Sequence, residues 1–251
     1  MSDETLAEAD VADWQRRLVG RSLDTARQRS IDRGSRFVRA AAKVLDRTNG
    51  ESLTVQEVAD EAGQSLRTLY QYFASKDDLL LAVHEEAARV FARMIRAAIA
   101  ELTDPTARLA GAILASGRLP AMHKSGVDRG LSALRLQLVQ ADPSLVARSQ
   151  APVTWLFQEL IEAVAATEPI TLPIEKATYL VSAVRTSFAL SITLGNDYGV
   201  ELPDVIDLTR YCLNGIGVAA ERDWIESVDE SLHLSGADTR SILRRLIKQQ
   251  L

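Results

Sequence analysis

The side chains of this 251-residue chain that are best suited to specific binding lie between Ser65 and Lys76. Residues three and four apart are neighbours on a helix, so a short helix expected over 66–73 presents one polar and aromatic side. That side carries Arg67, Thr68, Gln71 and Tyr72. The planar fork of an arginine fits guanine O6 and N7. Lys76 follows at the expected start of the next helix, where an ammonium group and free N–H groups both attract phosphate.

The charge of the chain supports a nucleic-acid partner in one region only. The formal net charge is −5, which taken alone argues against such a partner. Residues 16–76, however, contain twelve bases and seven acids, a net charge of +5. The first eight bases are all arginine, which suits phosphates and narrow minor grooves: Arg16, Arg17, Arg21, Arg27, Arg29, Arg33, Arg36 and Arg39. Since a charge run is also typical of a solvated helix face, charge alone leaves both interpretations open.

Two helices are expected before this polar stretch. Apolar residues recur at helical spacing over 32–47, and Asn49 with Gly50 ends that first helix. Thr54 and Glu57 form a capping box, which begins a short second helix that ends at Ala62 and Gly63.

The third and fourth helices follow directly. Ser65 caps the third, whose expected inner side carries Leu66, Leu69, Tyr70 and Phe73. Ser75 and Asp78 form a second capping box and begin a long fourth helix, whose apolar stripe reaches Leu102. Two short helices joined by a glycine-containing turn fit a helix-turn-helix, in which the second helix enters the major groove of DNA.

The stretch from Ser52 to Val83 resembles the DNA-binding signature of the TetR family of bacterial transcriptional regulators. The similarity is strongest in Thr68-Leu69-Tyr70-Gln71-Tyr72-Phe73, followed by Ser75-Lys76 and Leu79-Leu80. This resemblance implies an all-α fold, with an N-terminal helix-turn-helix DNA-binding domain and a C-terminal helical ligand-binding and dimerisation domain. It also implies a homodimer whose two third helices read successive major grooves of a palindromic double-stranded DNA operator.

The resemblance further implies roles for single residues. Positions that often face bases correspond to Gln56, Leu66, Arg67, Tyr70 and Gln71, and positions that often hold phosphates correspond to Thr68, Tyr72 and Lys76. With Ser65, these residues form the expected DNA-contacting set. Leu66 is apolar at a position where a polar side chain that hydrogen-bonds to a base is expected. Its side chain would contact a thymine methyl group or only pack against the protein.

We therefore expect four regions: an N-terminal extension or arm (1–29), the helix-turn-helix domain (30–77), the ligand-binding and dimerisation domain (78–226) and a C-terminal amphipathic extension (227–251). No strand-like alternation follows Pro105, and further helices are expected near 106–118, 127–140, 143–150, 153–167, 174–194, 204–226 and 237–250. The arginines of the extension fit either an arm in the minor groove or a short helix packed on the body.

A sensing pocket among the middle helices is implied by the resemblance to the family. The candidate lining residues are Leu119, Met122, His123, Leu136, Trp155, Phe157 and Phe188, although any bundle also needs apolar residues at such positions for its core. Few charges fall among the inward positions, which favours an apolar or amphipathic small-molecule effector. Arg135 and Arg185 remain able to pair with a carboxylate.

The last two long helices are expected to form the dimer interface. Small residues on them permit close approach of a partner helix, or serve packing within the chain: Ala183, Ser187, Ser191, Gly215, Gly217, Ala219 and Ala220.

Other classes of function have weaker support. The three histidines are far apart, and no HExxH, glycine-rich phosphate loop or GxSxG motif is present, so we expect no enzyme, no cofactor and no metal site. The alternatives are a helical protein-interaction module without DNA binding and a redox-responsive regulator acting through Cys212, the single cysteine. The acidic N-terminus is unlike a secretory signal, and the longest uncharged run, 186–196, is too short to span a membrane, so we expect a cytoplasmic protein without a membrane partner.

Overall fold

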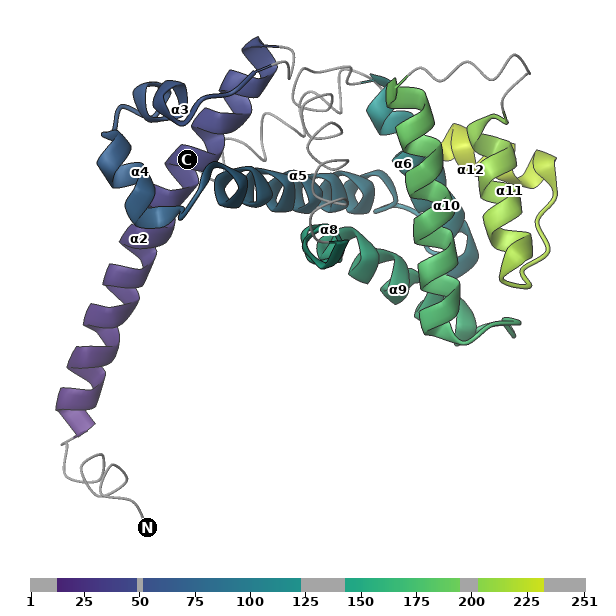
Figure 1. Cartoon of the computed structure of the whole chain (residues 1–251). Coiled ribbons are helices and arrows are strands. Elements are labelled where there is room, and N and C mark those ends of the chain that lie inside the picture. Colours follow the sequence, from purple (N-terminus) through teal and green to yellow (C-terminus); the bar gives the residue numbers. More distant parts are fainter. Residues whose placement is uncertain (1–12, 49–51, 123–142, 195–202, 233–251) are drawn as a thin grey trace.

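The computed structural model describes residues 13–48, 52–122, 143–194 and 203–232, which are helical without any strand (Figure 1). The helices are α2 (Asp13–Arg47), α3 (Val55–Glu61), α4 (Leu66–Tyr72), α5 (Lys76–Ala98), α6 (Pro105–Met122), α8 (Pro143–Ser149), α9 (Ala151–Ala165), α10 (Ile174–Leu194), α11 (Val205–Gly215) and α12 (Arg222–Ser231). The expected all-α class is confirmed. In the described part of the chain, no helix combines the length and apolar character needed to cross a membrane.

Two hydrophobic cores organise the molecule, and α5 belongs to both. The smaller core joins α2 to α3, α4 and the first turns of α5, with Phe37, Val58, Leu69 and Leu79 fully buried. The larger core joins the rest of α5 to α6 and to α9–α12. Figure 1 shows α5 running from one group of helices to the other. A rigid 23-residue helix therefore connects the two halves.

The first helix is much longer than the periodicity predicts. It begins at Asp13 rather than near residue 32 and continues for 35 residues to Arg47. Residues 23–33 are all exposed, so over these residues the extension is not a short helix packed on the body, and an arm in the minor groove stays a prediction. Figure 1 shows this part of α2 projecting away from the other helices. The segment before Phe37 has residues that favour a helix and contains no proline. The helix that carries the apolar face from Phe37 onward therefore extends back without a break.

The helix expected over 204–226 is instead two helices. A turn at Ile216–Glu221 separates α11 from α12, because Gly217 has φ of 94° and its would-be Cβ would lie 2.5 Å from Thr171 Cγ2. The Thr171 amide donates to the Ile216 carbonyl at 2.9 Å, and the Ala220 amide donates to Asn214 Oδ1 at 3.1 Å. The turn is therefore specified by contacts with a loop more than forty residues earlier in the chain.

The remaining helices agree with the expected ranges to within a few residues, and α10 agrees at both ends. The helices expected over 127–140 and 237–250 lie outside the described residues.

Candidate nucleic-acid interface and sensing domain

Local capping interactions define both short helices of the helix-turn-helix. Thr54 Oγ1 accepts from the Glu57 amide at 3.2 Å, while the Glu57 carboxylate accepts from the Thr54 amide at 2.9 Å. The hydrogen bonds from the Thr54 side chain and amide lower the pKa of Glu57. Gly63 closes α3 with φ of 62°, a conformation that L side chains rarely adopt. Ser65 Oγ then accepts from the Thr68 amide at 3.1 Å and begins α4. The predicted caps of α3 and α4 are confirmed. At the start of α5, Ser75 Oγ accepts from the Asp78 amide as predicted, but the Asp78 carboxylate accepts from the Ala74 amide rather than from that of Ser75.

Aromatic packing sets how α4 lies on α2. The rings of Phe37 and Phe73 meet edge to face at 6.3 Å, and the ring of Tyr72 lies 6.1 Å from that of Phe37. Leu69 is fully buried beneath them. The aromatic and aliphatic contacts fix the rotation of α4 about its own axis, and so decide which residues face outward.

The outward face differs from the expected one at the two tyrosines. Tyr70, expected on the inner side, is 49% exposed, whereas Tyr72, expected on the outer side, is half-buried against Phe37. The reason is that Phe73 terminates α4 in an extended conformation and takes the inner position next to Leu69. The exposed side of α4 is therefore formed by Arg67, Tyr70 and Gln71.

The other expected DNA-contacting residues surround this face. Gln56 on α3 is exposed and donates to Asp60 at 2.9 Å, and Lys76 is exposed at the first residue of α5. Ser65 is exposed and Thr68 half-buried, and their hydroxyls lie 2.8 Å apart. Leu66 is half-buried and packs on the smaller core. Packing therefore accounts for the apolar residue at this position, and its contact with a base stays a prediction.

The expected pocket residues that the structure describes lie in different surroundings, and their role in binding a ligand stays a prediction. Leu119 and Phe157 are almost completely buried in the larger core, whereas Trp155 is 66% exposed on α9. Trp155 therefore does not line the interior of the bundle, because it lies on the opposite side of α9 from the buried residues Val153, Leu156 and Phe157. Met122 is the last residue of α6, and His123 and Leu136 lie outside the described residues.

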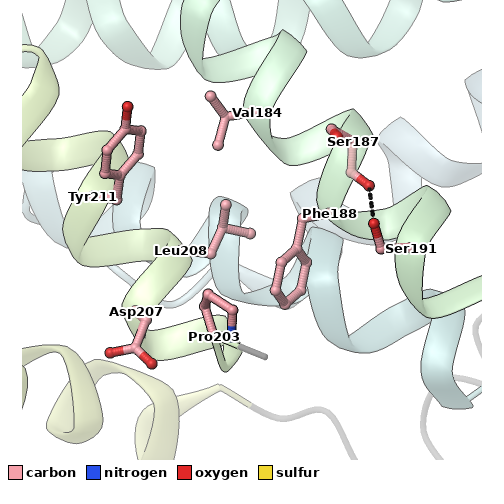
Figure 2. A pocket seen from close by; sticks show the side chains of 8 residues that line it. All are labelled: Val184, Ser187, Phe188, Ser191, Pro203, Asp207, Leu208 and Tyr211. Carbon is pink, nitrogen blue, oxygen red and sulfur yellow. Dashed lines mark hydrogen bonds between the residues drawn. The ribbon is translucent and has the colours of Figure 1, made fainter. Parts of the chain in front are cut away.

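Phe188 lies at a groove of about 450 Å³ between α10 and α11 (Figure 2). The lining residues are Val184, Ser187, Phe188, Ser191, Pro203, Asp207, Leu208 and Tyr211. Tyr179, Leu180 and Tyr211, on the same two helices, are among the most exposed large apolar side chains. An apolar groove with exposed aromatic residues beside it is typical of a surface that binds another molecule.

The small residues expected at the dimer interface are divided between two roles. Ala183, Ser187 and Gly215 are exposed on α10 and α11, and Ser191 is half-buried at the groove, so these remain available to a partner. Gly217 and Ala220 serve the turn before α12, although Gly217 and Ala219 also reach the surface.

Buried polar groups were not identified by the periodicity of the sequence. Arg185 is 5% exposed, and its guanidinium carbon lies 5.0 Å from the centre of the Phe157 ring. Thr178 and Ser182 lie on the same helix, about two turns and one turn before Arg185. The hydroxyl groups of both are buried and have no hydrogen-bond partner among the described residues. Cys212 is also buried, and burial raises the pKa of its thiol to about 11. A thiol in this state reacts slowly, which disfavours the redox-sensing alternative.

The short helix α8 lies beside α5 and contacts the smaller core. Leu145 of α8 packs on the smaller core, and Gln150, which follows α8, places its Nε2 3.3 Å from Nδ1 of the buried His84 on α5. The segment over 145–150 therefore contacts both the smaller core and α5. Among the described residues, no cluster of His, Cys, Asp and Glu has the composition of a metal site.

Comparison with known proteins agrees with this arrangement. Residues 37–83 match a family model described as bacterial regulatory proteins, tetR family. An uncharacterized HTH-type transcriptional regulator of Mycobacterium tuberculosis is 33% identical over 108 residues, which cover 43% of this chain and 48% of that protein. The chain thus matches about half the length of this curated relative.

Solved structures share the fold over most of the chain. RolR in complex with resorcinol has a TM-score of 0.57 and 16% identity, covering 81% of this chain and 95% of that one. A TetR transcriptional regulator from Rhodococcus sp. RHA1 has a TM-score of 0.54 and 20% identity, covering 78% and 100%. FadR from Bacillus subtilis in complex with stearoyl-CoA has a TM-score of 0.51 and 17% identity, covering 79% and 99%. The last two of these proteins are described as transcriptional regulators, and at such identities all three show the fold alone.

Proposed function

We propose that this chain, which carries the DNA-binding domain of the TetR family at residues 37–83, is a transcriptional repressor that binds a palindromic operator as a homodimer and is released by a small, mainly apolar effector. The observation that carries the proposal is the exposed face of α4, where Arg67, Tyr70 and Gln71 project from a capped and firmly packed helix. Side chains of these types read base edges, and Lys76 beside them is positioned for phosphate.

The dimer is supported by the outer face of α10 and α11. A single protomer exposes Tyr179, Leu180 and Tyr211 together with the groove shown in Figure 2. Because exposed apolar side chains gain free energy when a partner covers them, a second copy packed on this face would account for their exposure. Two helix-turn-helix units would then contact two half-sites about 34–36 Å apart.

Sensing is proposed for the larger core. Its described interior is apolar, with Leu119 and Phe157 among its residues, and Arg185 supplies the one buried guanidinium of the described residues. Occupation of this interior would move α9 or α10, and the contacts of Leu145 with the smaller core and of Gln150 with His84 of α5 would transmit that movement. An effector shifts the dimer only by its differential affinity for the two conformations.

Binding-site selection tests the DNA-binding part. Purified protein is incubated with randomised duplexes, and the enriched sequence is assayed as a complete palindrome and with one half-site scrambled. We expect two inverted half-sites, a dimer in sizing experiments and affinity that falls steeply with salt. Arg67→Ala should weaken the specific complex, whereas Arg89→Ala, which removes an exposed arginine on α5, serves as the control. Failure to enrich any sequence would favour the interaction-module alternative.

Thermal-shift screening tests the sensing part. Resorcinol, fatty acyl compounds and other apolar molecules are suitable first probes, since proteins of this fold bind such ligands. A compound that stabilises the protein should also lower operator affinity if it is an inducer. If operator affinity is unchanged at saturation, linkage requires that DNA does not alter the affinity for that compound, and the compound is not the effector.

A further inference from the structure

We infer that the exposed N-terminal part of α2 is a second DNA-contacting element, which binds the phosphate backbone outside the bases reached by α4. The inference rests on the proposed DNA binding by the helix-turn-helix and assigns an additional site to it. Three properties of the extension lead to it: its exposure, its charge and its position relative to α4.

The exposure of the extension calls for a partner outside the chain. Residues 23–33 are all exposed, including Leu23 at 64% and Ile31 at 51%. Most helical stability in proteins comes from the packing of an amphipathic face rather than from the propensity of the helix alone. A continuous helix that begins at Asp13 therefore benefits from a surface that holds it in place.

The charge of the extension selects a polyanion as that surface. The part of α2 before Phe37, residues 13–36, contains seven arginines, no lysine and three aspartates, a net charge of +4, whereas residues 1–12 before it carry four acids and no base. Arg27, Arg29 and Arg33 are exposed, and none forms an ion pair within the described residues; the Asp32 carboxylate instead accepts from Gln28 Nε2 at 2.9 Å. A second copy of the same extension would be repelled, whereas duplex DNA offers one negative charge per about 1.7 Å.

The position of this part of α2 brings it next to the end of α4. A Cβ on Gly34 would lie 3.8 Å from the Tyr72 ring, so Gly34 marks the side of α2 that faces the end of α4. Arg27 is seven residues earlier, which at 3.6 residues per turn places it about 20° from Gly34 and roughly 10 Å along the axis. Arg29 is five residues earlier, and its direction differs by about 140°. Arg27 thus continues the side of α2 that adjoins α4, while Arg29 points away from it.

This difference provides a matched pair of variants. Arg27→Ala and Arg29→Ala remove the same charge from exposed positions two residues apart, and both keep the helix intact. The full chain and both variants are titrated with the duplex obtained by selection, at several KCl concentrations, and the complexes are footprinted with hydroxyl radicals. Circular dichroism should show that both variants have the same helix content as the parent chain.

We expect Arg27→Ala to weaken binding about tenfold and Arg29→Ala to change it less than threefold. Losing one phosphate contact per protomer should make the salt slope less negative by about 1.8 for the dimer, at about 0.9 per contact. Arg27→Ala should also lose backbone protection outside the half-sites, with base contacts in the half-sites retained.

Several results would overturn the inference. If both variants lose the same amount of DNA affinity, the extension acts only through its overall positive charge and makes no specific contact. If both variants keep the wild-type affinity and footprint, the extension does not contact DNA. If Arg27→Ala instead dissociates the dimer without altering the footprint, the extension binds a second copy. Each of these leaves the proposed function standing, whereas failure of the wild-type chain to select any duplex removes both.

Discussion

Gly217 is the residue at which a single added methyl group has the most clearly predictable cost. Its φ of 94° is rarely adopted by L residues, and a Cβ there would lie 2.5 Å from Thr171 Cγ2 and 3.0 Å from the Thr171 backbone nitrogen. Non-glycine residues at positive φ cost about 1–2 kcal/mol. Relief of the contact requires movement of Thr171, whose amide donates to the Ile216 carbonyl at 2.9 Å.

Gly217→Ala should therefore lower the free energy of unfolding by about 2–4 kcal/mol, adding an overpacking cost of about 1–2 kcal/mol to the backbone strain. Gly215→Ala is the matched control for packing within the chain, because a Cβ at Gly215, at the end of α11, would meet no described atom of the same chain within 4 Å. Sizing both variants shows whether the proposed dimer is retained. Alanine at position 215 lowers the conformational entropy of the unfolded chain. The free energy of unfolding of Gly215→Ala should therefore be unchanged or higher by up to about 1 kcal/mol.

Urea unfolding at one fixed protein concentration, followed by circular dichroism, measures both variants against the parent chain. Operator affinity of the folded variants should be affected little, because the turn lies in the larger core and far along the chain from α4. If Gly217→Ala is as stable as Gly215→Ala, the strained turn does not separate α11 from α12 as the structure describes.

Further predictions concern the interface and the titrating groups. Arg67→Ala should relax sequence preference by about 1–3 kcal/mol, whereas Lys76→Ala should weaken all sequences alike, and competition with random DNA separates the two. Cys212, with a thiol pKa of about 11, should resist alkylation in the native protein at pH 8 and react in urea. The hydrogen bond from Arg96 lowers the pKa of Glu159. The ion pair of Glu159 with Arg96 should therefore stabilise the fold above the ordinary glutamate pKa, and this stabilisation should be lost as pH falls through the lowered pKa of Glu159. The unfolding curves of Glu159→Gln and the parent should then converge in acid.

Local sequence determined the helix-turn-helix almost completely. The capping box of Thr54 and Glu57, the glycine at the end of α3 and the Ser65 cap each act within three or four residues, so the chain specifies them before any tertiary contact forms. The same short range explains why the residues that carry the family resemblance, from Thr68 to Lys76, are recognisable without a structure.

Tertiary contacts decided what the helical period left open. The packing of Phe37 on Tyr72 and Phe73 rotated α4 so that Tyr70, rather than Tyr72, faces outward. Trp155 is apolar like its neighbours, and only the arrangement of α9 on the core shows that it points to the surface. Thr171 and Gly217 meet across a wide separation in sequence, so the break between α11 and α12 depends on a contact that no local pattern encodes. A periodic pattern reports which positions share a face, but the direction of that face is chosen by the elements packed against it.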